Sequence, residues 1–175
     1  MGDSYTAGPL ILNQLPDPLG CWRSDNNYPH LVARATGSAL RDRSCSAAET
    51  RDLTSPQYVL GGPNPPQLHA LDNTVGTVSL QIGGNDIGFT EILFRCLAIL
   101  PLGTPCRDLY TSGGVDELSR RIAATAPKVR AALAEAARRA PAARIRRGLP
   151  GHPPGGTAGM LAGATDRSRR RSLPS

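Results

Sequence analysis

The chain has 175 residues, of which 39% are apolar, and this composition fits a globular protein with one hydrophobic core. Its formal net charge is +6, but residues 1–143 hold 13 basic and 13 acidic side chains, whereas residues 144–175 hold 7 arginines and one acid. The charge therefore belongs to the C-terminal segment, so the composition gives no reason to expect nucleic acid as a partner of the body. No apolar run is long enough to span a membrane, and no signal peptide is recognised in these residues.

The N-terminal part predicts short elements separated by loops. Residues 7–13 predict a helix, and residues 15–27, with their Pro, Gly, Asp and Asn, predict a loop. Residues 28–36 carry apolar side chains at helical spacing and precede Gly37, which is typical of a helix end. Residues 39–44 predict a short strand.

The central part contains the clearest strand signal. Residues 54–66, rich in Gly and Pro, predict a surface loop, and residues 66–71 predict a brief helix. Residues 77–82, TVSLQI, are β-branched and apolar, and they predict a buried strand that ends in a glycine turn.

Two helical stretches follow that strand. Residues 90–99 are strongly apolar and predict a helix packed against the sheet. Residues 115–133 have one apolar helical face, which Pro127 is expected to kink or divide. Alternation of strands and helices predicts an α/β fold with a mainly parallel sheet, of which this chain supplies two or three strands.

Two glycine-containing motifs carry the chemistry: GDSYTAG at residues 2–8 and GGNDIGF at residues 83–89. A serine between an acidic and an aromatic residue suits a sharp turn from a strand into a helix, which exposes its hydroxyl. The second motif follows the predicted strand. Together they place a hydroxyl, a carboxamide and backbone N–H groups at strand ends, where α/β proteins bind ligands. This set of groups is suited to acyl transfer.

With CWRS at residues 21–24, Tyr28-Pro29, and SCSAAET at residues 44–50, these motifs resemble the GDSL, or SGNH, family of serine esterases and lipases, specifically its secreted actinobacterial branch. The resemblance runs from Gly2 to about Ala143. It implies a three-layer α/β/α sandwich of the flavodoxin-like type, incomplete in these residues. It also implies a secreted monomer that acts on small-molecule or lipid esters without a cofactor.

In this resemblance Ser4 is the nucleophile, framed by Gly2 and Asp3. A serine hydroxyl attacks an ester only when a base takes its proton. The alternative is that Ser4 merely caps the helix that follows.

The same resemblance makes Asn85, framed by Gly84 and Asp86, a donor to the oxyanion, beside the N–H of Ser4 itself. The alternative is an ordinary turn, because Asn and Gly both accept positive φ. A third donor in the family is a glycine N–H, and Ala47 stands at that position. An alanine still supplies the N–H, but its Cβ disfavours a positive φ.

No Asp-x-x-His motif, which carries the base in the family, occurs in these residues. The three histidines, His30, His69 and His152, are more typical of solvated or capping side chains. A serine hydrolase without its base loses on the order of a million-fold in turnover. The sequence therefore predicts a nearly inactive chain, with hydrolysis no more than about tenfold above a Ser4→Ala control.

The four cysteines match the disulfides of the family in sequence order, Cys21 with Cys45 and Cys96 with Cys106. Four reduced thiols are the alternative. The spacing contains no zinc signature, so no metal is expected.

Residues 144–175 are rich in Gly, Pro, Arg and Ser and are predicted to be disordered. An apolar buried strand is expected after the alanine-rich helix that ends near Ala143, but the sequence there is Arg-Ile-Arg-Arg. One hypothesis is a change of reading frame near Arg144, and the rival is a basic interaction tail. Two further functions therefore stay open: a non-catalytic protein that binds acyl esters, and a basic module that binds nucleic acid through this tail.

Overall fold

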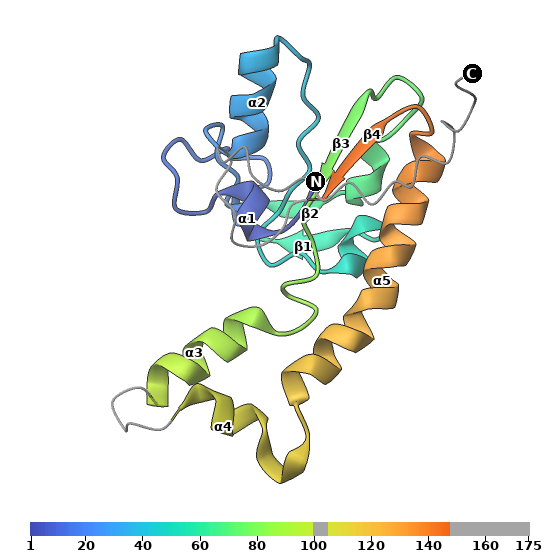
Figure 1. The fold of residues 1–175 in the computed structure, drawn as a ribbon. Coiled ribbons are helices and arrows are strands. Elements are labelled where there is room, and N and C mark those ends of the chain that lie inside the picture. Colours follow the sequence, from blue (N-terminus) through green and yellow to red (C-terminus); the bar gives the residue numbers. More distant parts are fainter. Residues whose placement is uncertain (100–104, 148–175) are drawn as a thin grey trace, which may run out of the picture.

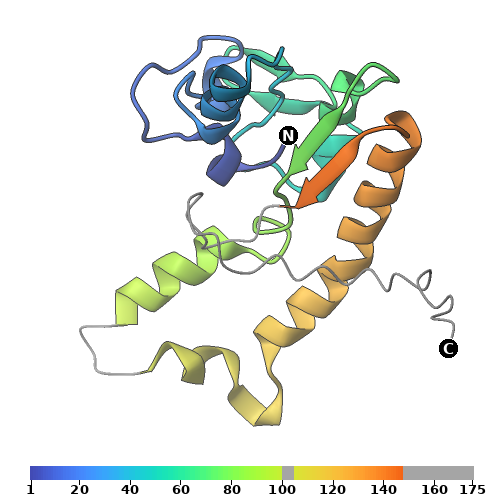
Figure 2. The same cartoon turned by 45° about the horizontal axis from the view of Figure 1, so that its top comes forward.

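The computed structural model describes residues 1–99 and 105–147. Its centre is a parallel pair of strands, β3 (Thr77–Leu80) and β4 (Arg144–Arg147), with Val78 opposite Ile145. The long helix α5 (Glu117–Arg139) lies beside this pair in both views of the ribbon (Figures 1 and 2). The parallel pair and its crossover helix form an α/β unit, as the sequence predicts.

One face of the β3–β4 pair packs into the hydrophobic core. Side chains alternate along a strand, so Val78 and Leu80 point to the same face, and both are buried. Small residues of α5 and the segment after it, including Ala132 and Ala136, pack against them, and Ile145 of β4 joins the edge of this cluster. Small side chains allow the helix to approach the sheet closely.

The opposite face borders a groove of about 760 Å³. Helix α2 (Tyr28–Thr36) lies across this groove, and its Tyr28 hydroxyl is 3.2 Å from Ser79 Oγ on β3. Helices α2 and α5 therefore lie on opposite sides of the strand pair, although the two strands do not form the large sheet of a complete sandwich.

Short elements connect these parts. They are the helix α1 (Ser4–Ala7), the antiparallel strands β1 (Gln57–Val59) and β2 (Gly62–Asn64), and the 3-10 turns η1 (Leu19–Cys21), η2 (Thr50–Leu53) and η3 (Gln67–Ala70).

The remaining helices form a projecting arm, which we define as α3 (Phe89–Ile99), α4 (Cys106–Tyr110), η5 (Ser112–Gly114) and the first half of α5. Both ribbon views show α3 and α4 extending away from the strands (Figures 1 and 2). The prediction that α3 packs against the sheet is wrong: Leu93, Phe94 and Leu97 are 44%, 66% and 51% exposed.

Several predicted elements are confirmed. Helix α2 covers residues 28–36 and ends at Gly37, which has φ +63°. Strand β3 covers the first four residues of the predicted strand 77–82, and η3 lies within the helix predicted at residues 66–71.

Other predictions are wrong for identifiable reasons. The helix expected at residues 7–13 ends at Ala7, because Gly8 adopts a left-handed φ of +78°. Residues 39–44 form no strand. Side-chain hydrogen bonds hold this segment instead: the Asp42 carboxylate accepts the Ser44 N–H at 2.9 Å. The predicted loop 54–66 contains the β1–β2 hairpin.

Two corrections concern the C-terminal half. Helix α5 is not divided at Pro127 but continues through it. Proline removes one bond to the carbonyl four residues earlier, and both Pro127 and Ala123 are exposed residues, so the loss falls on the solvent side of the helix. Residues 144–147 form β4, although they were predicted to begin a disordered tail; the rest of that tail, from residue 148, lies outside the described residues.

Candidate active site

The first motif forms a sharp turn from an extended segment into a helix. Gly2 makes a parallel bridge to Gln81, just beyond β3, and the Asp3 N–H donates to the Gln81 carbonyl at 3.1 Å. Helix α1 then begins at Ser4, with the Asp3 carboxylate accepting the Tyr5 N–H at 3.1 Å. Ser4 is thus the first helical residue after a sheet-like pairing.

Gly2 is required at this turn. Its φ is +147°, and a Cβ added to it would lie 2.4 Å from both the Gln81 carbonyl oxygen and Thr6 Oγ1. Only glycine fits between the end of β3 and the first turn of α1.

Ser4 is only partly buried, and it retains free hydrogen-bonding capacity. Neither its N–H nor its hydroxyl has a hydrogen-bond partner among the described residues. Its two polar groups are therefore available to a ligand.

Ala47 adopts the backbone conformation that a glycine normally occupies. Its φ is +62°, in the left-handed region, where an L-residue costs about 1–2 kcal/mol. Ala47 is exposed, and its N–H has no acceptor in the part of the chain that the structure describes. The alanine at this position therefore keeps a free N–H, although its backbone conformation costs free energy.

The second motif holds the Ala47 segment in place. Asn85 Nδ2 donates to the Ala48 carbonyl at 2.8 Å. Asp86 accepts two bonds from Thr50, one from its N–H at 2.8 Å and one from its hydroxyl at 2.6 Å. Three bonds from two neighbouring side chains thus fix residues 48–50.

The two motifs lie side by side. A Cβ added to Gly84 would lie 3.6 Å from Asp3 Oδ2, and the rings of Tyr5 and Phe89 meet edge to face with centroids 6.1 Å apart. The structure therefore brings the segments of Ser4, Ala47 and Asn85 together, although they are far apart in the sequence.

Asp3 is the most perturbed acid of this cluster. Burial raises its pKa to about 6, and the nearby negative charge of Asp86 acts in the same direction, against the opposing effect of backbone N–H bonds. Below about pH 6, Asp3 is therefore largely uncharged.

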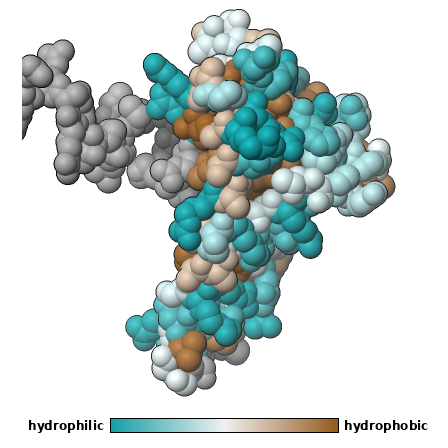
Figure 3. Space-filling model, turned by 90° about the vertical axis from the view of Figure 1, so that its right-hand side faces the viewer, coloured by the Kyte–Doolittle hydropathy of each residue, from teal (hydrophilic) through white to brown (hydrophobic). Residues whose placement is uncertain are grey.

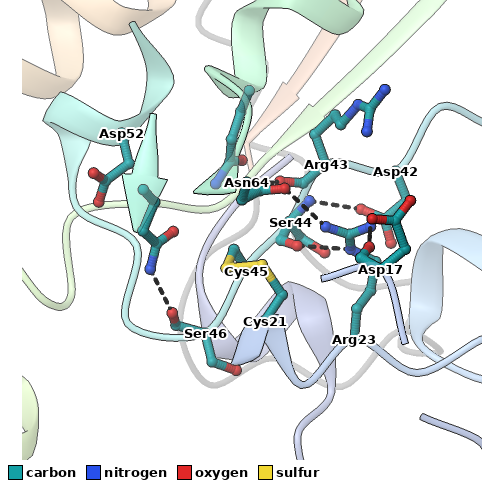
Figure 4. Close-up of a disulfide and its surroundings, with 12 residues drawn as sticks. Asp17, Cys21, Arg23, Asp42, Arg43, Ser44, Cys45, Ser46, Asp52 and Asn64 are labelled. Carbon is teal, nitrogen blue, oxygen red and sulfur yellow. Dashed lines mark hydrogen bonds between the residues drawn. A yellow bond between two sulfur atoms is a disulfide. The ribbon is translucent and has the colours of Figure 1, made fainter. Parts of the chain in front are cut away.

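A buried disulfide lies next to the first motif and supports the site. Cys21 and Cys45 are bonded, which confirms that pairing, and the Cys45 N–H donates to the Gly2 carbonyl at 3.0 Å. Figure 4 shows the buried Arg23 beside this disulfide, where it donates to the Ser44 carbonyl at 2.7 Å and to Asn64 Oδ1 at 3.1 Å. The disulfide thus ties the η1 segment to the residues that adjoin Gly2.

The comparisons with known proteins agree with these motifs. The family model described as GDSL-like Lipase/Acylhydrolase family matches residues 1–173. The chain belongs to this family.

Named relatives come from Streptomyces. The chain is 40% identical over 151 residues to Lipase 2 of Streptomyces coelicolor, which covers 83% of this chain and 49% of that protein. It is 32% identical over 97 residues to a lipase of Streptomyces rimosus, covering 55% of this chain and 32% of the relative. The chain thus spans about half the length, or less, of these curated relatives.

Solved structures show the same family. An extracellular lipase from Streptomyces rimosus is similar with a TM-score of 0.59 and 26% identity, and phospholipase A1 from Streptomyces albidoflavus NA297 with 0.60 and 25%. Each match covers 83% of this chain and 56% of the other. The α/β fold of this GDSL chain is therefore shared with solved lipases.

The described histidines of the GDSL chain are engaged elsewhere or exposed. His30 Nδ1 lies 2.7 Å from Asn27 Oδ1 and 3.7 Å from Asp42, at the start of α2. His69 is an exposed residue of η3. Neither is bonded to Ser4, and His152 lies outside the described residues.

Two hollows in the described part of the GDSL chain do not have Ser4 in their walls. The 760 Å³ groove lies between α2 and the β3–β4 pair, and a second hollow of about 610 Å³ lies between η2 and α5, with Asp86 in its wall. Figure 3 shows the molecule from the side of α5. This surface is mostly hydrophilic, with hydrophobic residues in places, including the tip of the arm.

Across residues 1–99 and 105–147, no cluster of three or more His, Cys, Asp or Glu side chains could hold a metal ion. Within the same residues, no helix combines the length and apolar character needed to cross a bilayer.

Sequence reasoning missed three buried polar residues that hold the site: Arg23, Asn64 and Gln67. Each bonds residues distant in the sequence, and no local pattern marks such contacts. Cys96 and Cys106 are also paired, as predicted.

Proposed function

We propose that this chain carries the nucleophile and oxyanion site of a serine ester hydrolase. Ser4 Oγ attacks the ester carbonyl, and the N–H groups of Ser4 and Ala47 with Asn85 Nδ2 bind the oxygen as it becomes negative. The observation that supports this most is the bond from Asn85 to the Ala48 carbonyl, because it ties the carboxamide to the residue that follows Ala47, whose own N–H has no acceptor among the described residues. One hydrogen of Nδ2 remains for a ligand.

Proton transfer limits the activity of these residues. The attacking hydroxyl must lose its proton to a base and the leaving alcohol must gain one. Neither described histidine lies in a bonding position for Ser4. We therefore propose that the 175 residues hydrolyse esters very slowly, and that their site can still bind an acyl ester without turnover.

The wider properties follow from the family. The named relatives are lipases, and one solved neighbour is a phospholipase A1, so we propose a small-molecule or lipid ester as substrate. We also propose the three-layer α/β/α sandwich for the whole protein and secretion of it, since a solved neighbour is an extracellular lipase. A monomer without nucleic-acid partners or cofactors fits this proposal.

Chemical rescue tests the proposal. Hydrolysis of p-nitrophenyl butyrate is measured with and without added imidazole, which can act as a base in solution. We expect imidazole to raise the rate in the native chain above the rate in Ser4→Ala, while Asn85→Ala lowers the rescued rate about 100-fold.

Matched controls are exposed residues of the same types. Ser38→Ala and Asn73→Ala remove a serine and an asparagine that lie away from the two motifs, and both should leave the rescued rate unchanged. Equal rates in the native chain and Ser4→Ala at every imidazole concentration would overturn the proposed nucleophile.

A further inference from the structure

Gln67 makes two hydrogen bonds to the peptide groups of a single residue, Gly2. Its Oε1 accepts the Gly2 N–H at 2.7 Å, and its Nε2 donates to the Gly2 carbonyl at 3.0 Å. Gln67 is fully buried and lies 65 residues further along the chain, outside both motifs. A neighbouring strand would make the same pair of bonds.

Gly2 is thereby held from both sides. On one side it bridges Gln81 next to β3, and on the other it meets the carboxamide of Gln67 and the N–H of Cys45. On that side no strand of residues 1–99 and 105–147 pairs with Gly2, and the Gln67 side chain makes the kind of bonds that a strand would make.

We infer that Gln67 is a positioning residue for Ser4. Its carboxamide fixes the Gly2 peptide groups, and Ser4 follows two residues later at the start of α1, so the direction of the nucleophile turn depends on these two bonds. This inference rests on the proposed function for its effect on Ser4 reactivity.

The backbone of Gln67 is itself well anchored. The next residue, Leu68, is fully buried in the hydrophobic core, and the preceding Pro66 has a fixed φ. A side chain that extends from such a segment can hold the Gly2 peptide in one orientation, because its own backbone is held by these two neighbours.

Two variants of similar size separate positioning from packing. A protonated glutamic acid offers both a donor and an acceptor, as the Gln carboxamide does, whereas a carboxylate only accepts. Gln67→Glu therefore keeps both bonds while protonated and loses the bond to the Gly2 carbonyl when it ionises, and burial raises the pKa at which this happens. Gln67→Met loses both bonds at any pH.

The measurement is the rate at which a fluorophosphonate labels Ser4, with imidazole present, relative to the native chain at the same pH. Between about pH 6 and pH 8, we expect the relative rate of Gln67→Glu to fall with pH, and that of Gln67→Met to stay about tenfold low throughout. Leu71→Ala, which removes partly buried core packing nearby, should label at the native rate while folded.

Native labelling in Gln67→Met, or a pH-independent rate for Gln67→Glu, would overturn the inference. If the native chain gives no Ser4 adduct, the proposed function fails, and amide hydrogen exchange then decides. We expect Gln67→Met to exchange the Asp3 and Cys45 amides at least about tenfold faster and the Leu31 amide of α2 at the native rate. Unchanged protection of Asp3 and Cys45 would overturn the inference on its own.

Discussion

The turn that presents Ser4 and the arm formed by α3, α4 and the start of α5 are held in opposite ways. Around Ser4, contacts join segments far apart in sequence, such as Gly2 with Gln67 and Asp86 with Thr50. In the arm, most ion pairs join residues three or four positions apart, such as Glu91 with Arg95 and Glu117 with Arg121. Local pairs support a helix but do not fix where it lies.

The comparison shows that contacts between segments far apart in the sequence are concentrated around Ser4. The position of the turn at Ser4 depends on several contacts at once. Each contact excludes a different alternative arrangement of that turn. The arm instead exposes apolar side chains, so it is expected to open locally at lower free energy than the Ser4 region. Four sets of variants test this difference.

The largest effect is expected from Gly2→Ala. The new Cβ would lie 2.4 Å from a backbone oxygen at a positive φ, so we expect a loss of at least ~3 kcal/mol in the free energy of unfolding. The matched control is Gly113→Ala in the arm, which has φ +67° with no atom within 4 Å and should cost only about 1–2 kcal/mol. Equal losses by denaturant unfolding would contradict the comparison.

The next largest effect is expected from the removal of a disulfide. The Cys21→Ser, Cys45→Ser double variant opens a loop of 24 residues and should lower the free energy of unfolding by about 3 kcal/mol. The corresponding Cys96→Ser, Cys106→Ser variant should speed amide exchange in α3 and α4 and leave the β3 amides protected. Global loss of protection in the second variant would show that the arm is part of the cooperative body.

The pKa of Asp3 predicts a pH dependence of stability. The folded-state pKa of about 6 lies above the unfolded value near 3.9, so the folded chain binds this proton more tightly. Its contribution is complete below about pH 4 and is lost as the pH rises through 6, by roughly 3 kcal/mol at most. Measured by urea unfolding at several pH values, Asp3→Asn should remove this part of the pH dependence of the free energy of unfolding. Asp116→Asn in the arm should keep it.

The smallest effect is expected from Phe94→Ser. This side chain is 66% exposed on α3, so we expect a change within about 0.5 kcal/mol in the free energy of unfolding. A loss above roughly 1 kcal/mol would mean that the apolar face of α3 is packed in solution.

The sequence predicts those elements whose local pattern agrees with the fold. Helix α2 has its Asn27 cap, Pro29 in the first turn and Gly37 at its end, and all three signals are local. Strand β3 is recognisable because Val78 and Leu80 alternate with polar residues, and the glycines after it mark the turn.

The elements that were missed depend on partners far away. Strand β4 lacks an apolar run, yet β3 supplies its backbone partners, and its single apolar side chain, Ile145, reaches the core. The exposed position of α3 could not be predicted, because its apolar residues suit a buried helix equally well. Motifs indicate Ser4 and Asn85 as site residues, but the role of Gln67 follows only from the distances to Gly2.

The most direct test is to locate the adduct after fluorophosphonate treatment with imidazole present. Peptide mass spectrometry should find it on Ser4, with labelling about 100-fold slower in Asn85→Ala and unchanged in Asn73→Ala. Label spread over several serines, or the same rate in native and Asn85→Ala chains, would contradict a nucleophile and oxyanion site built from these two motifs.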